Sequence, residues 1–197
     1  MTEIGLLALQ GDFAEHAAAF QRLGASTREV RKASELDGVD ALVIPGGEST
    51  TICRLMAAFD LLEPLRRFAA DRPIWGTCAG MIVLARRASD LDLPAVEVMD
   101  IGVRRNAFGR QLDSFEAAVD IPALGSEPFH AVFIRAPVVD EVGPGVDVLA
   151  RLPDGRAVAV QQGKLLATAF HPELTDDDRV HRHFLAMARP EAQQGVK

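Results

Sequence analysis

The chain has 197 residues, and its 21 Lys and Arg against 28 Asp and Glu give a net charge of −7. This acidic balance argues against a nucleic-acid surface, because such a surface needs clustered basic residues. No apolar run approaches the ~20 residues of a membrane span, and the chain opens on an apolar strand rather than a basic leader. We therefore expect a cytoplasmic protein with no membrane and no nucleic acid among its partners.

The first half of the chain alternates between short apolar runs and amphipathic segments. Strands are predicted at residues 4–9, 27–31, 41–44 and 74–77. Four helices are predicted: one that starts at residue 12, one that follows residue 51 and ends at residue 59, one at 61–70, and one directly after Cys78. Asp12 and Glu15 are spaced as a helix cap and its N3 partner, and Gly24 is a helix stop. This order predicts an α/β fold with a doubly wound, mostly parallel sheet flanked by helices.

After Arg87 the pattern changes to short strands between proline and glycine turns, which predicts an antiparallel strand excursion in the second half. Residues 157–162 and 165–170 are expected to form a hairpin. A last helix is predicted to start near Thr175, with three aspartates in its first turn, where negative charge is favoured. We expect one domain over residues 1–189 and a loose tail over residues 190–197.

Residues 73–81, PIWGTCAGM, join an apolar strand to a helix through a Gly-x-Cys-x-Gly turn. Such a turn brings the strand and helix backbones together, which explains a glycine on each side of Cys78. The thiol would stand at the N-terminus of the next helix, where a thiolate is favoured. Cys78 is thus either a reactive thiol or a buried structural cysteine, whereas Cys53 lies in a predicted helix and suits packing.

A base for this thiol is available at the end of a later strand, in the sequence His171-Pro172-Glu173. Pro172 favours an extended backbone at His171, so the side chains of His171 and Glu173 are expected on the same side. Glu173 would orient the imidazole through Nδ1 and leave Nε2 for Cys78. The pattern predicts a Cys-His-Glu triad.

Six short blocks stand in a recognisable order: LALQG at 7–11 followed by Glu15-His16, PGGESTT at 45–51, GTCAG at 76–80, RNAFGRQ at 105–111, FIRAP at 133–137 and HPE at 171–173. With these blocks the chain resembles the triad-type (class I) glutamine amidotransferases. More narrowly, it resembles the glutaminase subunits of pyridoxal phosphate synthases. The resemblance runs from Ile4 to the last helix, so it implies that residues 1–189 are a single glutaminase domain.

The resemblance implies hydrolysis of L-glutamine to glutamate and ammonia, without a metal or another cofactor. The ammonia would pass to a pyridoxal phosphate synthase subunit in a large heteromeric complex that makes vitamin B6. Backbone N–H groups of Ala79 and of the Gly46-Gly47 loop would hold the oxyanion. The residues expected to bind the amino-acid end of glutamine are Gly47, Glu48, Ser49, Arg105, Ile134 and Arg135.

Some of these assignments leave alternatives open. Arg105 and Arg135 suit either the α-carboxylate of glutamine or surface ion pairs, and Glu48 either meets the α-ammonium or sets the loop. The chain as a whole could also serve another synthase, such as imidazole glycerol phosphate synthase, or act as a non-catalytic binding subunit. A cysteine esterase or protease is a further alternative.

The expected product also suggests regulation, because ammonia released to water is wasted. Gly46 and Gly47 can turn a peptide at little cost. We hypothesise that the free subunit is nearly inactive, with a loop carbonyl facing the site until the synthase subunit docks. The docking face is expected to include Glu15 and His16.

Overall fold

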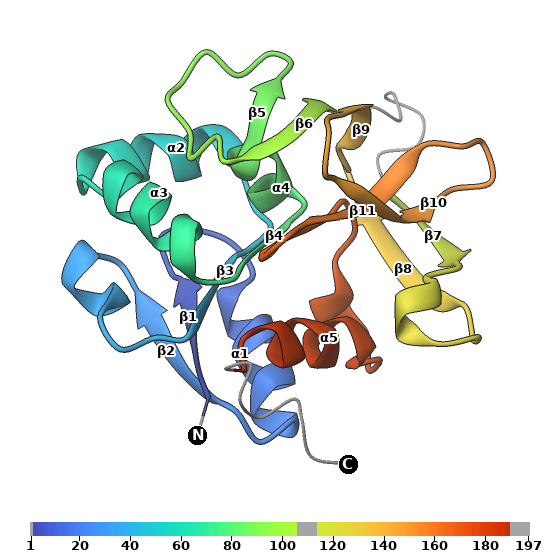
Figure 1. Cartoon of the computed structure of the whole chain (residues 1–197), viewed down its shortest axis with the longest axis horizontal. Coiled ribbons are helices and arrows are strands. Elements are labelled where there is room, and N and C mark those ends of the chain that lie inside the picture. The colour runs from blue at the N-terminus through green and yellow to red at the C-terminus, as the bar shows by residue number, and fades with distance from the viewer. Residues whose placement is uncertain (1, 106–113, 190–197) are drawn as a thin grey trace.

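The structure is a computed structural model that describes residues 2–105 and 114–189 (Figure 1). Its strands are β1 (Glu3–Leu7), β2 (Ser26–Val30), β3 (Ala41–Ile44), β4 (Ile74–Thr77), β5 (Ala85–Ala88), β6 (Met99–Arg104), β7 (Ser114–Val119), β8 (Phe129–Ile134), β9 (Val138–Val142), β10 (Asp147–Arg151), β11 (Ala157–Gln162) and β12 (Leu165–Thr168). Its helices are α1 (Phe13–Arg22), α2 (Ser49–Ala58), α3 (Leu62–Asp71), α4 (Ala79–Leu84) and α5 (Arg179–Met187), with 3-10 turns η1 (Ala33–Leu36), η2 (Pro122–Leu124) and η3 (Pro172–Leu174). Most of the RNAFGRQ block and the predicted tail lie outside the described residues.

A ten-stranded sheet has the order β2-β1-β3-β4-β12-β11-β9-β6-β5, with β10 paired to β11. The pairs from β2 to β12 are parallel. Pairing is then antiparallel through β11, β9 and β6, and β5 joins β6 in parallel. Strands β7 and β8 form a separate antiparallel pair. The predicted parallel half and antiparallel excursion are confirmed.

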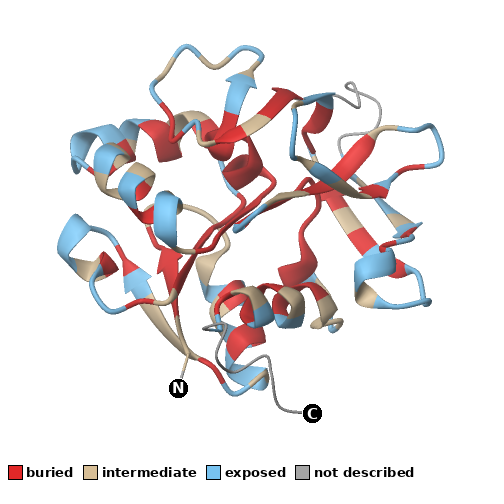
Figure 2. Cartoon of the chain, in the orientation of Figure 1, coloured by how far each residue is buried: buried red, intermediate tan, exposed pale blue. Residues whose placement is uncertain are grey.

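Helices cover both faces of the parallel half. Figure 1 shows α1 and α5 together on one side of β1, β3 and β4, with α2 and α3 on the other. Strands β3 and β4 are buried along their whole length, as the red colour in Figure 2 shows. The apolar runs of this region are continuous because both faces of the sheet are covered. Cys53 is buried in this core, which confirms the packing role expected of it, and Trp75 is buried there as well.

The parallel arrangement brings four loops to one edge of the sheet. Strands β1, β3, β4 and β12 are neighbours that run in the same direction, so their carboxyl ends meet. The segments that follow these ends contain Asp12, the Gly46-Gly47 pair, Cys78 and His171. The fold therefore collects the blocks that the sequence singled out.

Two helix starts differ from the sequence prediction. Helix α5 begins at Arg179 rather than near Thr175, because residues 172–174 form a 3-10 turn and Asp177 accepts a hydrogen bond from the Arg179 N–H. The acidic residues therefore precede the helix, with Asp178 at the N-cap, instead of filling its first turn. Asp12 is the N-cap residue of α1, but its side chain makes no capping hydrogen bond.

Helix α1 buries His16, Ala19 and Phe20 and exposes Glu15. The prediction that His16 lies on a docking face is wrong, because its side chain is 0% exposed. Helical geometry explains the difference, since adjacent residues on a helix point in different directions. Among the helices in the described ranges, none has the length and apolar character needed to cross a membrane.

Candidate active site

Cys78 occupies the turn between β4 and α4. Its backbone has φ +47° and ψ −102°, a conformation that residues with a Cβ rarely adopt. A Cβ at Gly80 would lie 2.0 Å from the carbonyl oxygen of Ile44, so glycine is needed where α4 passes β3. The Cys78 N–H donates to the Thr168 carbonyl at 2.8 Å, which ties the turn to β12. The predicted strand-turn-helix elbow is present.

His171 and Glu173 make the contact that the sequence predicted. His171 Nδ1 lies 2.8 Å from Glu173 Oε1, and both residues are buried. The local structure differs from the prediction, because a 3-10 turn over Pro172–Leu174, not an extended segment, brings the carboxylate to the ring. The backbone N–H of His171 donates to the Val132 carbonyl of β8 at 2.8 Å, so the short β7–β8 sheet helps to place the imidazole.

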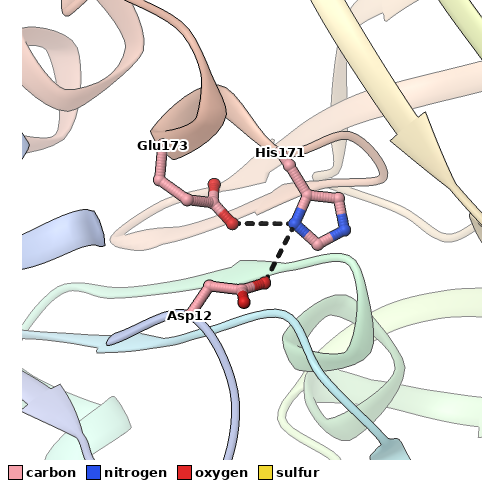
Figure 3. A group of neighbouring side chains, drawn as sticks. All are labelled: Asp12, His171 and Glu173. Atoms are coloured by element: carbon pink, nitrogen blue, oxygen red, sulfur yellow. Dashed lines mark hydrogen bonds and ion pairs between the residues drawn. The ribbon is translucent and has the colours of Figure 1, made fainter. Parts of the chain in front are cut away.

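A second carboxylate faces the same ring nitrogen, as Figure 3 shows. Asp12 Oδ2 lies 3.4 Å from His171 Nδ1 and reaches it from the start of α1. The sequence pattern predicted helix capping for Asp12 and did not indicate its place beside His171. Its position directly after the LALQG block was the one available signal, and aspartate before a helix is the usual capping pattern.

These neighbours control where protons reside. Burial alone would lower the pKa of His171, but its interactions with Asp12, Cys78 and Glu173 outweigh burial and raise that pKa. Burial raises the pKa of Glu173, and the hydrogen bond from His171 opposes this. With a second carboxylate at Nδ1, we assign the shared proton to the imidazole, which gives an imidazolium–carboxylate pair.

Asp12, His171 and Glu173 also place three potential ligand atoms within 4.8 Å of one another. A metal ion would need the lone pair of Nδ1. That nitrogen instead carries the proton donated to Glu173, so we do not identify these residues as metal ligands.

A cavity of about 370 Å³ opens beside Cys78. Its lining consists of Gln10, Asp12, Gly47, Glu48, Ser49, Cys78, Ala79, Ile82, Arg105, Ile134, Arg135 and His171. The structure thus brings together two predicted triad members, the oxyanion candidates Gly47 and Ala79, and all six predicted substrate-binding residues. Gln10, Asp12 and Ile82 line the cavity as well, although the sequence did not predict them as site residues. A larger hollow of about 510 Å³ beside β5 and β6 shares none of these residues.

Glu48 organises the loop before α2. Its carboxylate accepts hydrogen bonds from the Thr50 and Thr51 N–H groups at 3.1 and 2.7 Å and from the Thr51 hydroxyl at 2.8 Å. Burial opposes ionisation, but these hydrogen bonds lower the pKa of Glu48 to about 2. Arg105 Nη2 lies 3.6 Å from Glu48 Oε1. Of the two predicted alternatives, the structure shows Glu48 setting the loop.

The Gly46-Gly47 loop lies against both α1 and the catalytic histidine candidate. A Cβ at Gly46 would lie 2.4 Å from His171 Cε1, so a larger residue would displace the ring. The Gly46 carbonyl accepts a hydrogen bond from the Asp12 N–H at 3.2 Å. In a planar trans peptide the C=O and N–H groups point in opposite directions, so the Gly47 N–H points away from Asp12. Ala79 is the first residue of α4, and its N–H is therefore not used within the helix.

Comparison with known proteins gives consistent results. The sequence model of the SNO glutamine amidotransferase family matches residues 6–189. A relative from Herpetosiphon aurantiacus, named pyridoxal 5'-phosphate synthase subunit PdxT, is 58% identical over 93% of this chain and 99% of its own length. A relative of the same name from Desulforudis audaxviator is also 58% identical, over 94% of this chain and 98% of its own length.

Solved structures agree with this relationship. A crystal structure described as glutamine amidotransferase is 49% identical, with a TM-score of 0.89 over 94% of this chain and 98% of that chain. The structure of PurLQS from Thermotoga maritima has a TM-score of 0.65 over 95% of this chain and 99% of that chain, but at 14% identity it shows the fold alone. The matches over nearly the whole chain establish that this protein belongs to the SNO glutamine amidotransferase family.

Proposed function

We propose that this chain is a glutaminase that hydrolyses L-glutamine to glutamate and ammonia. The observation that carries the proposal is the cavity that both Cys78 and His171 line, with His171 Nδ1 in contact with the buried carboxylate of Glu173. In this proposal Cys78 is the nucleophile, His171 carries the proton and Glu173 orients and charges the imidazole. The membership of the glutamine amidotransferase family supports the substrate.

The reaction follows from these groups. The Cys78 thiolate adds to the side-chain carboxamide carbon of glutamine, and the developing oxyanion is held by backbone N–H groups of Ala79 and Gly47. His171 gives its proton to the departing nitrogen, so ammonia leaves and a γ-glutamyl thioester remains. His171 then takes a proton from water, and the resulting hydroxide adds to the thioester carbon. The C–S bond breaks, which releases glutamate and returns the Cys78 thiolate beside a protonated His171, and the proton of the new carboxyl group passes to solvent.

The amino-acid end of glutamine would lie toward Glu48 and the two arginines. Arg105 is held by the Asp90 carbonyl and lies near Glu48, while the exposed Arg135 adopts φ +43° at the cavity wall. Either guanidinium suits the α-carboxylate. Ser49 and Ile134, which also line the cavity, complete the proposed substrate contacts.

We further propose that the ammonia serves a pyridoxal phosphate synthase subunit in a heteromeric complex, because relatives with more than 90% mutual coverage are named as subunits of that synthase. The proposal places the complex in the cytoplasm, where the free thiols of Cys53 and Cys78 stay reduced. It also treats residues 1–189 as one glutaminase domain.

Docking is proposed to activate the enzyme by turning the Gly46-Gly47 peptide. Such a turn would break the hydrogen bond from the Asp12 N–H to the Gly46 carbonyl, so α1 and the oxyanion loop would respond together.

Glutamate production should be measured for the chain alone and with its pyridoxal phosphate synthase subunit, with Cys78→Ala as the blank. We expect turnover with the synthase and little without it. Equal rates in both conditions would refute activation by docking. No glutamate in either condition, or activation by an unrelated synthase alone, would refute the proposed function.

A further inference from the structure

A second polar cluster lies behind Glu173, on the side away from the cavity. It consists of His16 from α1, His181 from α5 and Thr77 at the end of β4, all of them buried. From the sequence we expected His16 on a docking face at the surface. The structure instead brings together two histidines that are 165 positions apart in the chain.

The contacts form a continuous chain of polar atoms. His181 Nε2 lies 3.0 Å from His16 Nδ1. The other nitrogen of His16, Nε2, lies 3.3 Å from the Thr77 hydroxyl and 3.5 Å from Glu173 Oε2. Glu173 Oε1 is 2.8 Å from His171 Nδ1. Glu173 therefore stands between His171 on the cavity side and His16 on the interior side.

The unpartnered atoms decide which ring nitrogens carry protons. Within the described residues, Glu173 Oε2 and His181 Nδ1 are the buried side-chain atoms that lack a hydrogen-bond partner. If His16 carried its proton on Nδ1, its bare Nε2 would face the carboxylate, and His181 would bury an unused N–H. If His16 carries its proton on Nε2, the N–H faces Glu173 Oε2, and His181 leaves only a lone pair unused. The second arrangement avoids both penalties.

The surroundings keep both rings uncharged. The His16 ring meets Trp75 edge-on with centroids 5.2 Å apart, and the His181 ring meets Trp75 and Phe20 at 4.9 and 5.0 Å. Burial in this aromatic cage is the main cause that lowers the pKa of His16 and brings that of His181 to about 4. A neutral His16 remains an N–H donor without adding a second positive charge beside Glu173.

We propose that neutral His16 is a positioning residue, whose Nε2–H faces Glu173 Oε2 and holds the carboxylate in register with His171, while His181 fixes the tautomer of His16. This inference rests on the proposed function of the triad. The contact at 3.5 Å is long, and His16 shares its N–H with Thr77, so His16 restrains Glu173 rather than binding it tightly. Without it, Glu173 Oε2 would be a buried carboxylate oxygen facing no donor.

The tautomers can be tested on the unmodified chain. We would label histidine with ¹⁵N, record two-bond ¹H–¹⁵N correlation spectra at neutral pH, and assign the rings from His16→Gln and His181→Gln spectra. Neutral rings with the proton on Nε2 are expected at both positions. A proton on Nδ1 of His16, or a charged His16, would overturn the proposal. This result does not depend on glutaminase activity, so it can fail or succeed separately from the proposed function.

Turnover tests the positioning role, measured with the synthase subunit present. His16→Leu fills the site without a donor and should lower kcat roughly tenfold to a hundredfold with little change in the KM for glutamine. His16→Gln retains an amide N–H and should recover most of that loss. His183→Gln is the control and should keep full turnover, because His183 lies on α5 with His181 but contacts Gln161 outside the cluster.

Full turnover in His16→Leu would overturn the proposal. An equal loss in His16→Leu and His16→Gln would also overturn it, because that result would indicate packing rather than hydrogen bonding. Activity that survives Cys78→Ala would instead refute the proposed function and leave the tautomer result standing.

Discussion

The two sides of Glu173 hold histidines in similarly buried positions but with opposite proton affinity. His171, on the cavity side, is 4% exposed, and His16, on the interior side, is 0% exposed. Carboxylates and a thiol raise the pKa of His171 despite its burial, whereas burial among aromatic rings lowers the pKa of His16. The comparison teaches that partners, more than depth, decide the charge of a buried histidine. Glu173 thus lies between His171, which is suited to proton transfer, and His16, which is suited to positioning.

The largest effect is expected on the cavity side. Cys78→Ala removes the proposed nucleophile, so turnover should fall about 10⁴-fold or more. The melting temperature should stay close to that of the native chain, because a small side chain replaces a small one. Cys53→Ala, in α2, is the control and should keep turnover, since burial raises the pKa of that thiol to about 11. Retained turnover in Cys78→Ala would show that another nucleophile operates.

Glu173→Gln alters the residue that both sides share. The uncharged amide cannot stabilise the imidazolium form of His171, so we expect kcat to fall roughly 10²- to 10⁴-fold with a smaller change in KM. Steady-state glutamate production measures both constants, and the exposed Glu127→Gln is a control. An unchanged kcat would mean that Asp12 alone can orient the ring.

Mild acid should lower the free energy of unfolding through the histidines on the interior side of Glu173. His181 has a pKa of about 4 in the folded state and about 6.5 when unfolded, so the unfolded chain takes up more protons between these values. Stability is therefore present above pH 6.5 and falls as the pH is lowered toward 4, by about 3 kcal/mol from this residue. His16 acts in the same direction, whereas the raised pKa of His171 has the opposite sign.

Urea unfolding at pH 6.5, 5.5 and 4.5 would measure this loss. In His181→Gln the slope of stability against pH should be smaller. The same slope in the variant and the native chain would show that His181 does not titrate as described.

Asp12→Asn should give the smallest effect and sharpen the comparison from the cavity side. The side chain is 38% exposed and lies 3.4 Å from His171 Nδ1, so its charge is partly screened by water. We expect the pKa of His171, followed by NMR, to move down, and turnover to fall roughly threefold to tenfold. Stability should hardly change, because no capping hydrogen bond is lost. An unmoved His171 pKa would show that Glu173 acts alone.

The sequence predicted the features that arise from local patterns. The bounds of β3 and β4 match the predicted runs, because continuous apolar residues mark strands covered on both faces. The contact between His171 and Glu173 was also predicted from their spacing, although a 3-10 turn makes it and not the extended segment that Pro172 suggested.

The features that sequence reasoning missed depend on distant partners or on a choice between two partners. His16 meets His181 only because α1 and α5 share a face of the sheet, which no local pattern encodes. Asp12 lies at the N-cap of α1, where its side chain could cap the helix, but its carboxylate lies near His171 instead. Helix α5 starts later than predicted because the Asp177 carboxylate accepts a hydrogen bond from the Arg179 N–H.

The backbone at Cys78 has a consequence for how such a chain evolves. A positive φ at a residue with a Cβ costs of the order of 1–3 kcal/mol, and glycine would avoid most of that cost. Selection for stability alone would therefore favour glycine at position 78. With Cys78 as the proposed nucleophile, selection for turnover would instead retain cysteine in spite of its strained backbone. A copy of this gene released from its chemical task would be expected to lose the thiol early and to gain thermal tolerance as it did so.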